Sequence, residues 1–241
     1  MPNILWTSHR GFHQQHVENT MGSFTAAVRA GFTSLETDLR TTLDGHIVLH
    51  HDAGMSKTSG EGKNIHGITI KEFKATRLLD GQHGMDLQEF MDAFGSCQWI
   101  FDIKPESAQE TIDGLQSLCD ERGGSEWLLE NTRFLLWSRS HESYLKSLFP
   151  KADILANEWE CHRAGVCSLV GLGFMSGIEK GRAYALPPKF LGIRLLKKRI
   201  LKAYRSRGAK VIAYLPEGEE ELDTAILAHV DEILTNGLPR K

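Results

Sequence analysis

Cysteine is scarce in this sequence, charge of neither sign dominates, and long hydrophobic runs are missing. Its four cysteines are scattered without a C-x-x-C pair, at Cys97, Cys119, Cys161 and Cys167. This spacing argues against a zinc site and a disulfide framework, so we expect buried free thiols in a reducing cytosol. The net charge is −3 and the pI about 6.4. Nucleic-acid-binding domains are normally basic, and we therefore expect no nucleic-acid partner.

No segment approaches the ~20 consecutive apolar residues that a membrane-spanning helix needs. Residues 1–6 also lack the charged start and apolar run of a signal peptide. We therefore predict a cytoplasmic protein without a transmembrane segment. Neither repeats nor low-complexity tracts appear, and 241 residues is a common length for an α/β barrel. We expect a single domain over residues 1–241.

Residues 36–52 carry the densest group of chemically useful side chains. Glu36 and Asp38 are two apart in an extended apolar context, so their carboxylates point to the same side of a strand. An Asp-Gly turn follows, and a second predicted strand then ends at His50 and His51. A pair of acids and an imidazole are thereby expected on neighbouring strands.

Predicted strands and helices alternate along the chain. The strands are expected at 4–8, 34–39, 47–52, 98–105, 134–138, 153–156, 183–186 and 210–214, and the helices at 23–31, 87–94, 106–119, 142–149 and 195–206. The rest of the second half is less regular. This alternation is typical of a parallel sheet with crossover helices. Polar residues end several strands, which fits an α/β fold of the TIM (β/α)8 barrel type, with its chemistry at the carboxyl ends. Residues 53–85 are expected to be a loop excursion after the third strand.

In order and spacing, the polar residues resemble the glycerophosphodiester phosphodiesterase family, which are metal-dependent enzymes on a TIM barrel. The matching residues are His9-Arg10-Gly11, Glu18-Asn19-Thr20, Ser23-Phe24, Glu36-Thr37-Asp38, Thr42-Leu43-Asp44-Gly45 and His51-Asp52. A looser match continues through Asp102-Ile103-Lys104-Pro105 and Ser138 to residues 233–239. The resemblance is dense in the first half and thin from about residue 157 to 210.

This resemblance implies two catalytic histidines, three metal-binding carboxylates and two phosphate-binding cations. They are His9 and His51; Glu36, Asp38 and Asp102; and Arg10 and Lys104. The family pattern favours His51 over His50, which is then left for outer packing. All-oxygen ligands suit one Mg²⁺ or Ca²⁺ ion better than zinc. Three carboxylates, a divalent cation, a phosphodiester and two basic side chains together sum to neutrality.

The family's usual residues are replaced at three places. Asp102 is found where the family usually has Glu, Tyr214-Leu215 where it usually has Trp-Thr, and Asn236 where it usually has Asp. Aspartate is one methylene shorter than glutamate, so the cation or its waters must shift to compensate. Glu18 is expected either to support Arg10 or to charge a helix N-terminus. Ser138 and Tyr214 are further candidates for supporting roles.

The implied reaction is hydrolysis of a glycerophosphodiester to glycerol 3-phosphate and an alcohol. One alternative is a phospholipase D-like or lysophospholipid-directed phosphodiesterase, which would need an apolar groove near residues 53–85. Another is a non-catalytic barrel that binds phosphate esters. The nucleophile is either water or the substrate's own glycerol hydroxyl, and the order in which the histidines act stays open.

Residues 181–216 include many basic residues and no acidic one. The stretch 189–210 is either a solvated helix face or a region attracted to anionic headgroups, which would give weak contact with a membrane surface. The predicted partner is otherwise a small-molecule glycerophosphodiester, and the oligomeric state is left open.

Overall fold

The computed structural model describes residues 4–240. The chain divides into two compact units. We call residues 8–153 with 236–240 the N-terminal unit, and residues 4–7 with 154–235 the C-terminal unit. Two strands, β1 (Leu5–His9) and β6 (Asp153–Ile154), each begin in one unit and end in the other.

The strands of the N-terminal unit are arranged around β2. Besides the end of β1 they are β2 (Ser34–Thr41), β3 (Ile47–Leu49), β4 (Gln98–Ile103) and β5 (Thr132–Leu135). β2 pairs in parallel with β4, and β4 pairs in parallel with β5, whereas β3 is antiparallel to β2. Every residue of β2 is buried. Its polar side chains must therefore find partners inside the unit.

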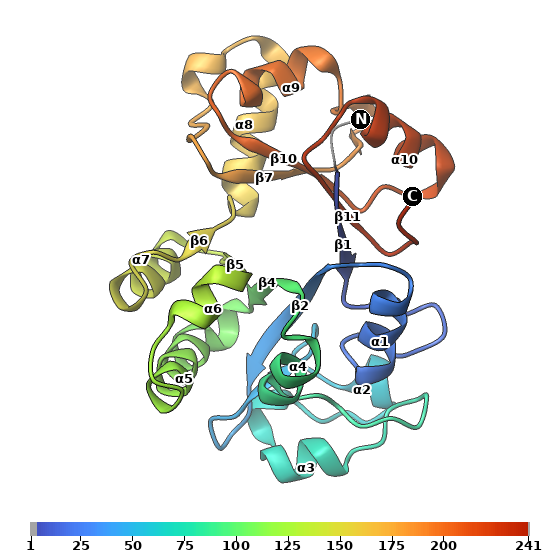
Figure 1. Ribbon diagram of the computed structural model, residues 1–241, viewed down its shortest axis with the longest axis vertical. Coiled ribbons are helices and arrows are strands. Elements are labelled where there is room, and N and C mark those ends of the chain that lie inside the picture. Colours follow the sequence, from blue (N-terminus) through green and yellow to red (C-terminus); the bar gives the residue numbers. More distant parts are fainter. Residues whose placement is uncertain (1–3, 241) are drawn as a thin grey trace. The chain divides into compact units, whose positions relative to one another are not determined.

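Helices follow most of these strands in the N-terminal unit (Figure 1). They are α1 (Met21–Arg29), α2 (Ser56–Ser59), α3 (Ile70–Ala75), α4 (Leu87–Phe94), α5 (Ala108–Glu121), α6 (Glu126–Asn131) and α7 (Arg139–Leu148), with 3-10 turns at Ile65–Gly67 and Pro105–Ser107. Capping boxes start α1 at Thr20, α3 at Thr69 and α4 at Asp86. In each, the cap side chain accepts from a backbone N–H that the helix leaves unpaired. The predicted helices in this unit are confirmed.

Aromatic side chains join α1 and α4 to β4. The ring of Phe90 on α4 lies 4.8 Å from Phe24 on α1 and 6.1 Å from Phe101 on β4, both edge to face. All three side chains are fully buried. Edge-to-face pairs add to the free energy gained by burying the rings, so this cluster fixes the helices against the strands that carry the polar residues.

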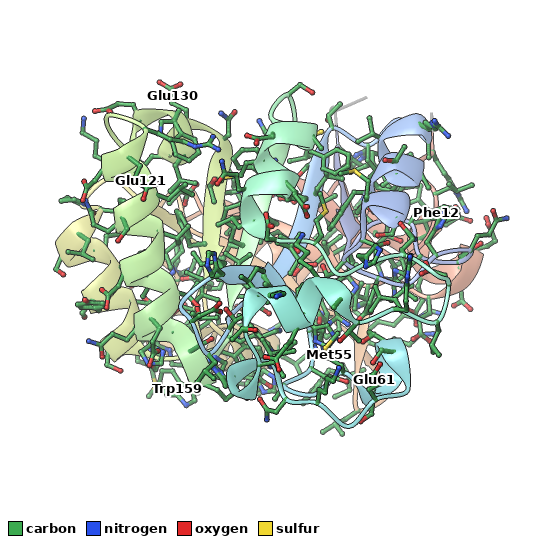
Figure 2. All side chains as sticks on the ribbon, turned by 90° about the horizontal axis from the view of Figure 1, so that it is seen from below. Phe12, Met55, Glu61, Glu121, Glu130 and Trp159 are labelled. Atoms are coloured by element: carbon green, nitrogen blue, oxygen red, sulfur yellow. The ribbon has the colours of Figure 1, made fainter. Side chains whose placement is uncertain are left out.

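The excursion between β3 and α4 has a small apolar core of its own. Met55, Ile65 and Phe73 are fully buried and pack against Val48 of β3. Met55 and the exposed Glu61 can both be found in Figure 2. The excursion after the third strand is therefore packed onto the N-terminal unit, as the sequence indicated.

The C-terminal unit repeats the alternation of strands and helices. Its elements are α8 (Glu158–Val170), a 3-10 turn at Gly173–Met175, β7 (Ala183–Leu186), β8 (Lys189–Phe190), β9 (Ile193–Arg194), α9 (Lys198–Arg205), β10 (Lys210–Tyr214), α10 (Gly218–Leu227) and β11 (Glu232–Thr235). β10 pairs in parallel with β7 and β11, and β8 with β9 forms a short hairpin. Tyr184 and Tyr204 are buried in its core with ring centroids 5.4 Å apart.

Two expectations differ from the structure. The strand expected at 47–52 ends at Leu49, so His51 follows a short antiparallel strand and not the carboxyl end of a parallel one. The second half is also more regular than the sequence pattern indicated, because α8 begins after Asn157 with a capping box between Asn157 and Glu160. No helix within residues 4–240 is long and apolar enough to cross a membrane.

Candidate active site

Three carboxylates meet in the N-terminal unit. Glu36 and Asp38 alternate along β2, and the parallel register places Asp102 of β4 directly beside Asp38. One ligand atom from each residue lies within 4.8 Å of the others. All three side chains are buried. Strand register alone therefore gathers the three acids that the sequence indicated as metal ligands.

The electrostatics of these acids show a shortage of positive charge. Burial, with Asp38 and Asp102 nearby, raises the pKa of Glu36 well above its usual value. Burial also raises the pKa of Asp102. Asp38 behaves in the opposite way, because Lys104 and Arg10 outweigh its burial and lower its pKa. Two cations face three carboxylates, and an all-oxygen donor set of this kind fits a hard divalent cation.

Lys104 lies between two of the acids. Its Nζ atom is 2.7 Å from Oδ1 of Asp38 and 2.6 Å from Oδ2 of Asp102. The ammonium also lies 5.4 Å from the ring centroid of Trp137, whose Nε1–H donates to Oδ1 of Asp102 at 2.7 Å. Asp102 therefore has one oxygen on Lys104 and the other on Trp137.

Arg10 approaches Asp38 from the turn after β1. Its Nε atom lies 3.0 Å from Oδ2 of Asp38, and its Nη1 atom lies 3.1 Å from Oε2 of Glu18. Arg10 and Gly11 both have positive φ, at 57° and 78°. A β-carbon on Gly11 would come within 2.5 Å of the Ser23 hydroxyl oxygen. Only glycine fits there, and the sharp turn directs Arg10 toward Asp38.

Asn19 is a site residue that the sequence analysis did not single out. Its Nδ2–H donates to Oδ2 of Asp38 at 2.9 Å, while its Oδ1 accepts from the Thr37 hydroxyl at 2.8 Å. Its backbone N–H donates to the carbonyl of Arg10 at 3.0 Å. One buried amide thus links β2 to the turn that carries Arg10.

His9 ends β1 beside Glu36. Its Nδ1 atom is 2.7 Å from Oδ1 of Asn236, and its Nε2 atom is 3.9 Å from Oε2 of Glu36. Burial, and then the neighbouring Arg10, lower its pKa to about 4. A neutral ring whose Nδ1–H donates to the Asn236 amide oxygen leaves Nε2 as the proton acceptor.

His51 follows β3 and is held mainly through its backbone. Nε and Nη2 of Arg40 donate to the His51 carbonyl at 3.0 and 2.7 Å, while Nη1 of Arg40 pairs with Glu106 at 3.1 Å. The imidazole is about one-third exposed, and its Nδ1 lies 2.7 Å from Oδ1 of Asp52. The other oxygen of Asp52 binds Lys57 at 2.7 Å. The ring is oriented by a carboxylate and remains open to solvent.

His50 has a structural place next to the same acids. Its backbone N–H donates to the carbonyl of Asp38 at 3.0 Å. Its ring is buried between the carbonyl of Asp52 and the hydroxyl of Thr58, at 2.7 and 2.9 Å. His50 therefore ties the excursion to β2, and His51 is the more accessible of the two histidines.

The proposed supporting residues are divided between the two units. Glu18 pairs with Arg10, as one of its two expected roles required. The hydroxyl of Ser138 accepts from the backbone of His141 and caps α7. Tyr214 ends β10 in the C-terminal unit. Trp137, one residue before Ser138, contacts Asp102 and Lys104 but has no motif that would have identified it.

The chain resembles known phosphodiesterases along its length. A sequence model described as "Glycerophosphoryl diester phosphodiesterase family" matches residues 9–119. "Probable glycerophosphodiester phosphodiesterase 2" of Mycobacterium tuberculosis is 25% identical over 242 residues, covering 95% of this chain and 86% of the relative. "Glycerophosphodiester phosphodiesterase" of Caldanaerobacter subterraneus is 24% identical over 243 residues, covering 96% and 93%.

Solved structures give the same fold. The glycerophosphoryl diester phosphodiesterase domain of a Mycobacterium tuberculosis protein has a TM-score of 0.82 at 12% identity, covering 98% of this chain and 96% of that one. A glycerophosphodiester phosphodiesterase from Thermotoga maritima has a TM-score of 0.72 at 20% identity, covering 98% and 96%. The predicted TIM-barrel fold is thereby confirmed. Because the family's sequence pattern falls on the segment that builds this site, and named members align with nearly the whole chain, the chain is similar to the glycerophosphoryl diester phosphodiesterase family of enzymes.

Proposed function

We propose that the protein hydrolyses a glycerophosphodiester to glycerol 3-phosphate and an alcohol, with the help of one divalent cation. The observation that carries this proposal is the meeting of three buried acids with two cations beside His9. The names of the relatives agree with it. Hydrolysis of a phosphodiester requires charge neutralisation, an activated nucleophile and a proton for the leaving oxygen.

Glu36, Asp38 and Asp102 would hold the cation, for which Mg²⁺ and Ca²⁺ are the candidates. When bound, it would polarise a phosphoryl oxygen and offset negative charge. The raised pKa of Glu36 supports such a site, because a buried carboxylate without enough positive charge nearby favours its protonated form. A divalent cation would supply the missing charge.

Arg10 and Lys104 would bind phosphate oxygens. In Arg10, Nε is engaged by Asp38 and Nη1 by Glu18, which holds the planar guanidinium in one orientation. Within the described part of the chain Nη2 has no partner, and we assign it to a phosphate oxygen. Lys104 would supply a point charge from the other side of Asp38.

The two histidines would divide the proton transfers. His9 is neutral with Nε2 unprotonated, which suits it to accept the nucleophile's proton. His51 is partly exposed and oriented by Asp52, which suits it to donate a proton to the leaving oxygen. Either water or the glycerol hydroxyl of the substrate could be the nucleophile in this scheme.

The direct test is release of glycerol 3-phosphate from glycerophosphocholine, with Mg²⁺ and Ca²⁺ supplied separately. We expect activity that a chelator abolishes and that His9→Ala and His51→Ala each reduce by at least ~100-fold, the lower range for general acid–base catalysis. His46→Ala, in an exposed turn, is the matched control and should retain activity. Activity that survives the chelator and both active-site substitutions would reject the proposal.

A lysophospholipid-directed activity is the second candidate. "Lysophospholipase D GDPD1" of Rattus norvegicus is 40% identical over 65 residues, only 21% of that protein. The C-terminal unit has an apolar groove lined by Val166, Leu169, Phe190 and Ile193, away from the expected residues 53–85. A panel that adds lysophosphatidylcholine to glycerophosphocholine decides between the two, because only the lysophospholipid carries an acyl chain.

A further inference from the structure

One helix of the C-terminal unit exposes an apolar face. Trp159, Val166 and Val170 are spaced by seven and four residues, so they lie on the same side of α8. All three are exposed, with Trp159 at 61%. The opposite side of α8 is buried and includes Cys161, Ala164 and Gly165. An amphipathic helix normally turns its polar side outward, and α8 has apolar residues on both sides.

The turn after α8 adds more exposed apolar side chains. Leu172, Phe174 and Met175 are all exposed, and Phe174 reaches 82%. The turn folds back along α8, because Nε of Arg163 donates to the carbonyl of Ser176 at 3.2 Å. These side chains therefore continue the apolar side of the helix.

The hairpin β8–β9 lies against the same helix. The ring of Phe190 is 5.3 Å from His162 of α8, and Phe190 and Ile193 share a groove with Val166. Leu191, at the tip of the hairpin, is 86% exposed. We call the exposed apolar side chains of α8, of the turn at 171–175 and of the hairpin the α8 face.

Cations in α9 and just after it border the α8 face. α8 and α9 are in contact (Figure 1). A β-carbon added to Gly171 would lie 3.4 Å from an Nη atom of Arg199. A β-carbon added to Gly173 would lie 3.1 Å from an Nη atom of Arg207. The basic side chains thus stand beside the turn that carries Phe174.

Several basic residues between 189 and 207 have no acidic partner within the described residues. Lys189 and Arg194 of the hairpin are neutralised by Glu221 and Glu220 of α10, at 3.1 and 2.6 Å. By contrast, the exposed Lys197, Lys198 and Arg199 form no ion pair within residues 4–240. Their charge is available to an external anion.

We propose that the α8 face docks on the surface of an anionic phospholipid bilayer. Exposed Phe, Leu and Trp side chains next to a basic segment match a surface whose headgroups are anionic and whose interior is apolar. A second copy of the chain fits less well, because a two-fold interface uses the same patch of both copies and would bring two basic segments into one interface. This inference is independent of the proposed hydrolysis.

The test is co-sedimentation of the full chain with vesicles of phosphatidylcholine alone and of phosphatidylcholine with phosphatidylglycerol. We expect binding to the anionic vesicles only, weakened by high salt. Loss of three charges in Lys197→Gln/Lys198→Gln/Arg199→Gln should lower the partition coefficient on the order of a hundredfold, since each basic residue contributes about one factor of five. Phe174→Ser/Leu191→Ser should lower it by at least roughly tenfold.

Matched controls use exposed residues elsewhere. Leu79→Ser/Leu227→Ser removes two exposed leucines, and Arg29→Gln/Lys71→Gln/Lys151→Gln removes three exposed charges. Both should bind like the original protein. Brominated lipid should quench the fluorescence of Trp159, and Trp159→Phe should remove that component.

Three outcomes of the vesicle assay would overturn the inference. They are no binding to either vesicle, binding that neither set of substitutions weakens, and binding that only the charge substitutions weaken. A dimer in analytical ultracentrifugation that Phe174→Ser/Leu191→Ser dissociates would also overturn it, because the α8 face would then be covered by a second copy.

Discussion

Nδ1 of His9 lies 2.7 Å from Oδ1 of Asn236, although residues 154–235 of the C-terminal unit lie between the two in the sequence. An amide oxygen only accepts, so the hydrogen bond fixes the proton on Nδ1. A carboxylate at the same position would also attract the positive form of the ring. The amide therefore helps to keep His9 neutral, which burial and Arg10 already favour.

The first prediction is that Asn236→Asp raises the pKa of His9. The pKa of His9 should move upward from about 4, because a carboxylate stabilises the imidazolium. NMR titration of the ring in metal-free protein measures it directly. Asn236→Ser, which cannot supply a charge, is the control. A pKa that stays at about 4 with aspartate would contradict the assigned hydrogen bond.

The lowered pKa of His9 also makes the free energy of unfolding depend on pH. Between pH 4 and about 6.5 the unfolded chain binds a proton at His9 that the folded chain does not, so the contribution of His9 to the free energy of unfolding rises with pH in that window. His9→Gln should remove this contribution. Urea unfolding of both proteins at several pH values, without metal, isolates it as the difference between their slopes.

The second prediction concerns Lys104→Met. Without the ammonium, Asp38 and Asp102 lose a partner at 2.7 and 2.6 Å inside the unit. We expect the metal-free protein to lose about 3–5 kcal/mol of unfolding free energy, the usual cost of breaking a buried ion pair. Urea unfolding in chelator measures it, with the exposed Lys71→Met as control. Equal stability of Lys104→Met and Lys71→Met would show that Lys104 is not needed to balance the acids.

The third prediction separates the two functions of Trp137. Trp137→Phe keeps an aromatic ring near Lys104 but removes the N–H that donates to Asp102 at 2.7 Å. We expect metal affinity to fall by roughly 10–100-fold, as happens when a ligand loses its supporting hydrogen bond. Calorimetric titration with Mg²⁺ or Ca²⁺ gives the value. Trp127 lies on α6, and Trp127→Phe should bind the metal as the original protein does. Unchanged metal affinity in Trp137→Phe would show that Asp102 is not a ligand or that the Trp137 N–H does not support it.

The fourth prediction tests the turn after β1. Gly11→Ala introduces a β-carbon 2.5 Å from Oγ of Ser23 at a φ of 78°. We expect it to cost at least ~1 kcal/mol of stability and to displace Arg10, raising KM more than it lowers kcat. Gly45→Ala, also at positive φ but with open space around it, controls for backbone strain alone. Similar KM and kcat values in Gly11→Ala and Gly45→Ala would show that the turn does not position Arg10.

Much of the site could be predicted because its residues are close in sequence or fixed by strand geometry. Glu36 and Asp38 share a face by alternation, and the parallel pairing of β2 with β4 brings Asp102 beside them. Resemblance to the family supplied the histidines and the cations. The predicted extent of β7 and β10 also agrees with the structure, since both are short apolar runs.

Other parts depend on contacts that no local pattern encodes. Trp137 reaches Asp102 across 35 residues, and Asn236 reaches His9 across 227. Asn19 was visible within a motif, but its side chain's two partners became clear only when β2 and the turn at Arg10 were placed together. α8 was missed because its apolar residues fall on both sides, which hides the helical period.

Arg40 donates to the backbone carbonyl of His51, whereas the imidazole of His51 is held separately by Asp52. The backbone at position 51 is therefore held by hydrogen bonds that do not depend on the side chain there. Under the proposed function, His51→Ala would therefore remove a proton donor while the backbone at position 51 keeps its hydrogen bonds to Arg40, and such a variant would bind the substrate without cleaving it.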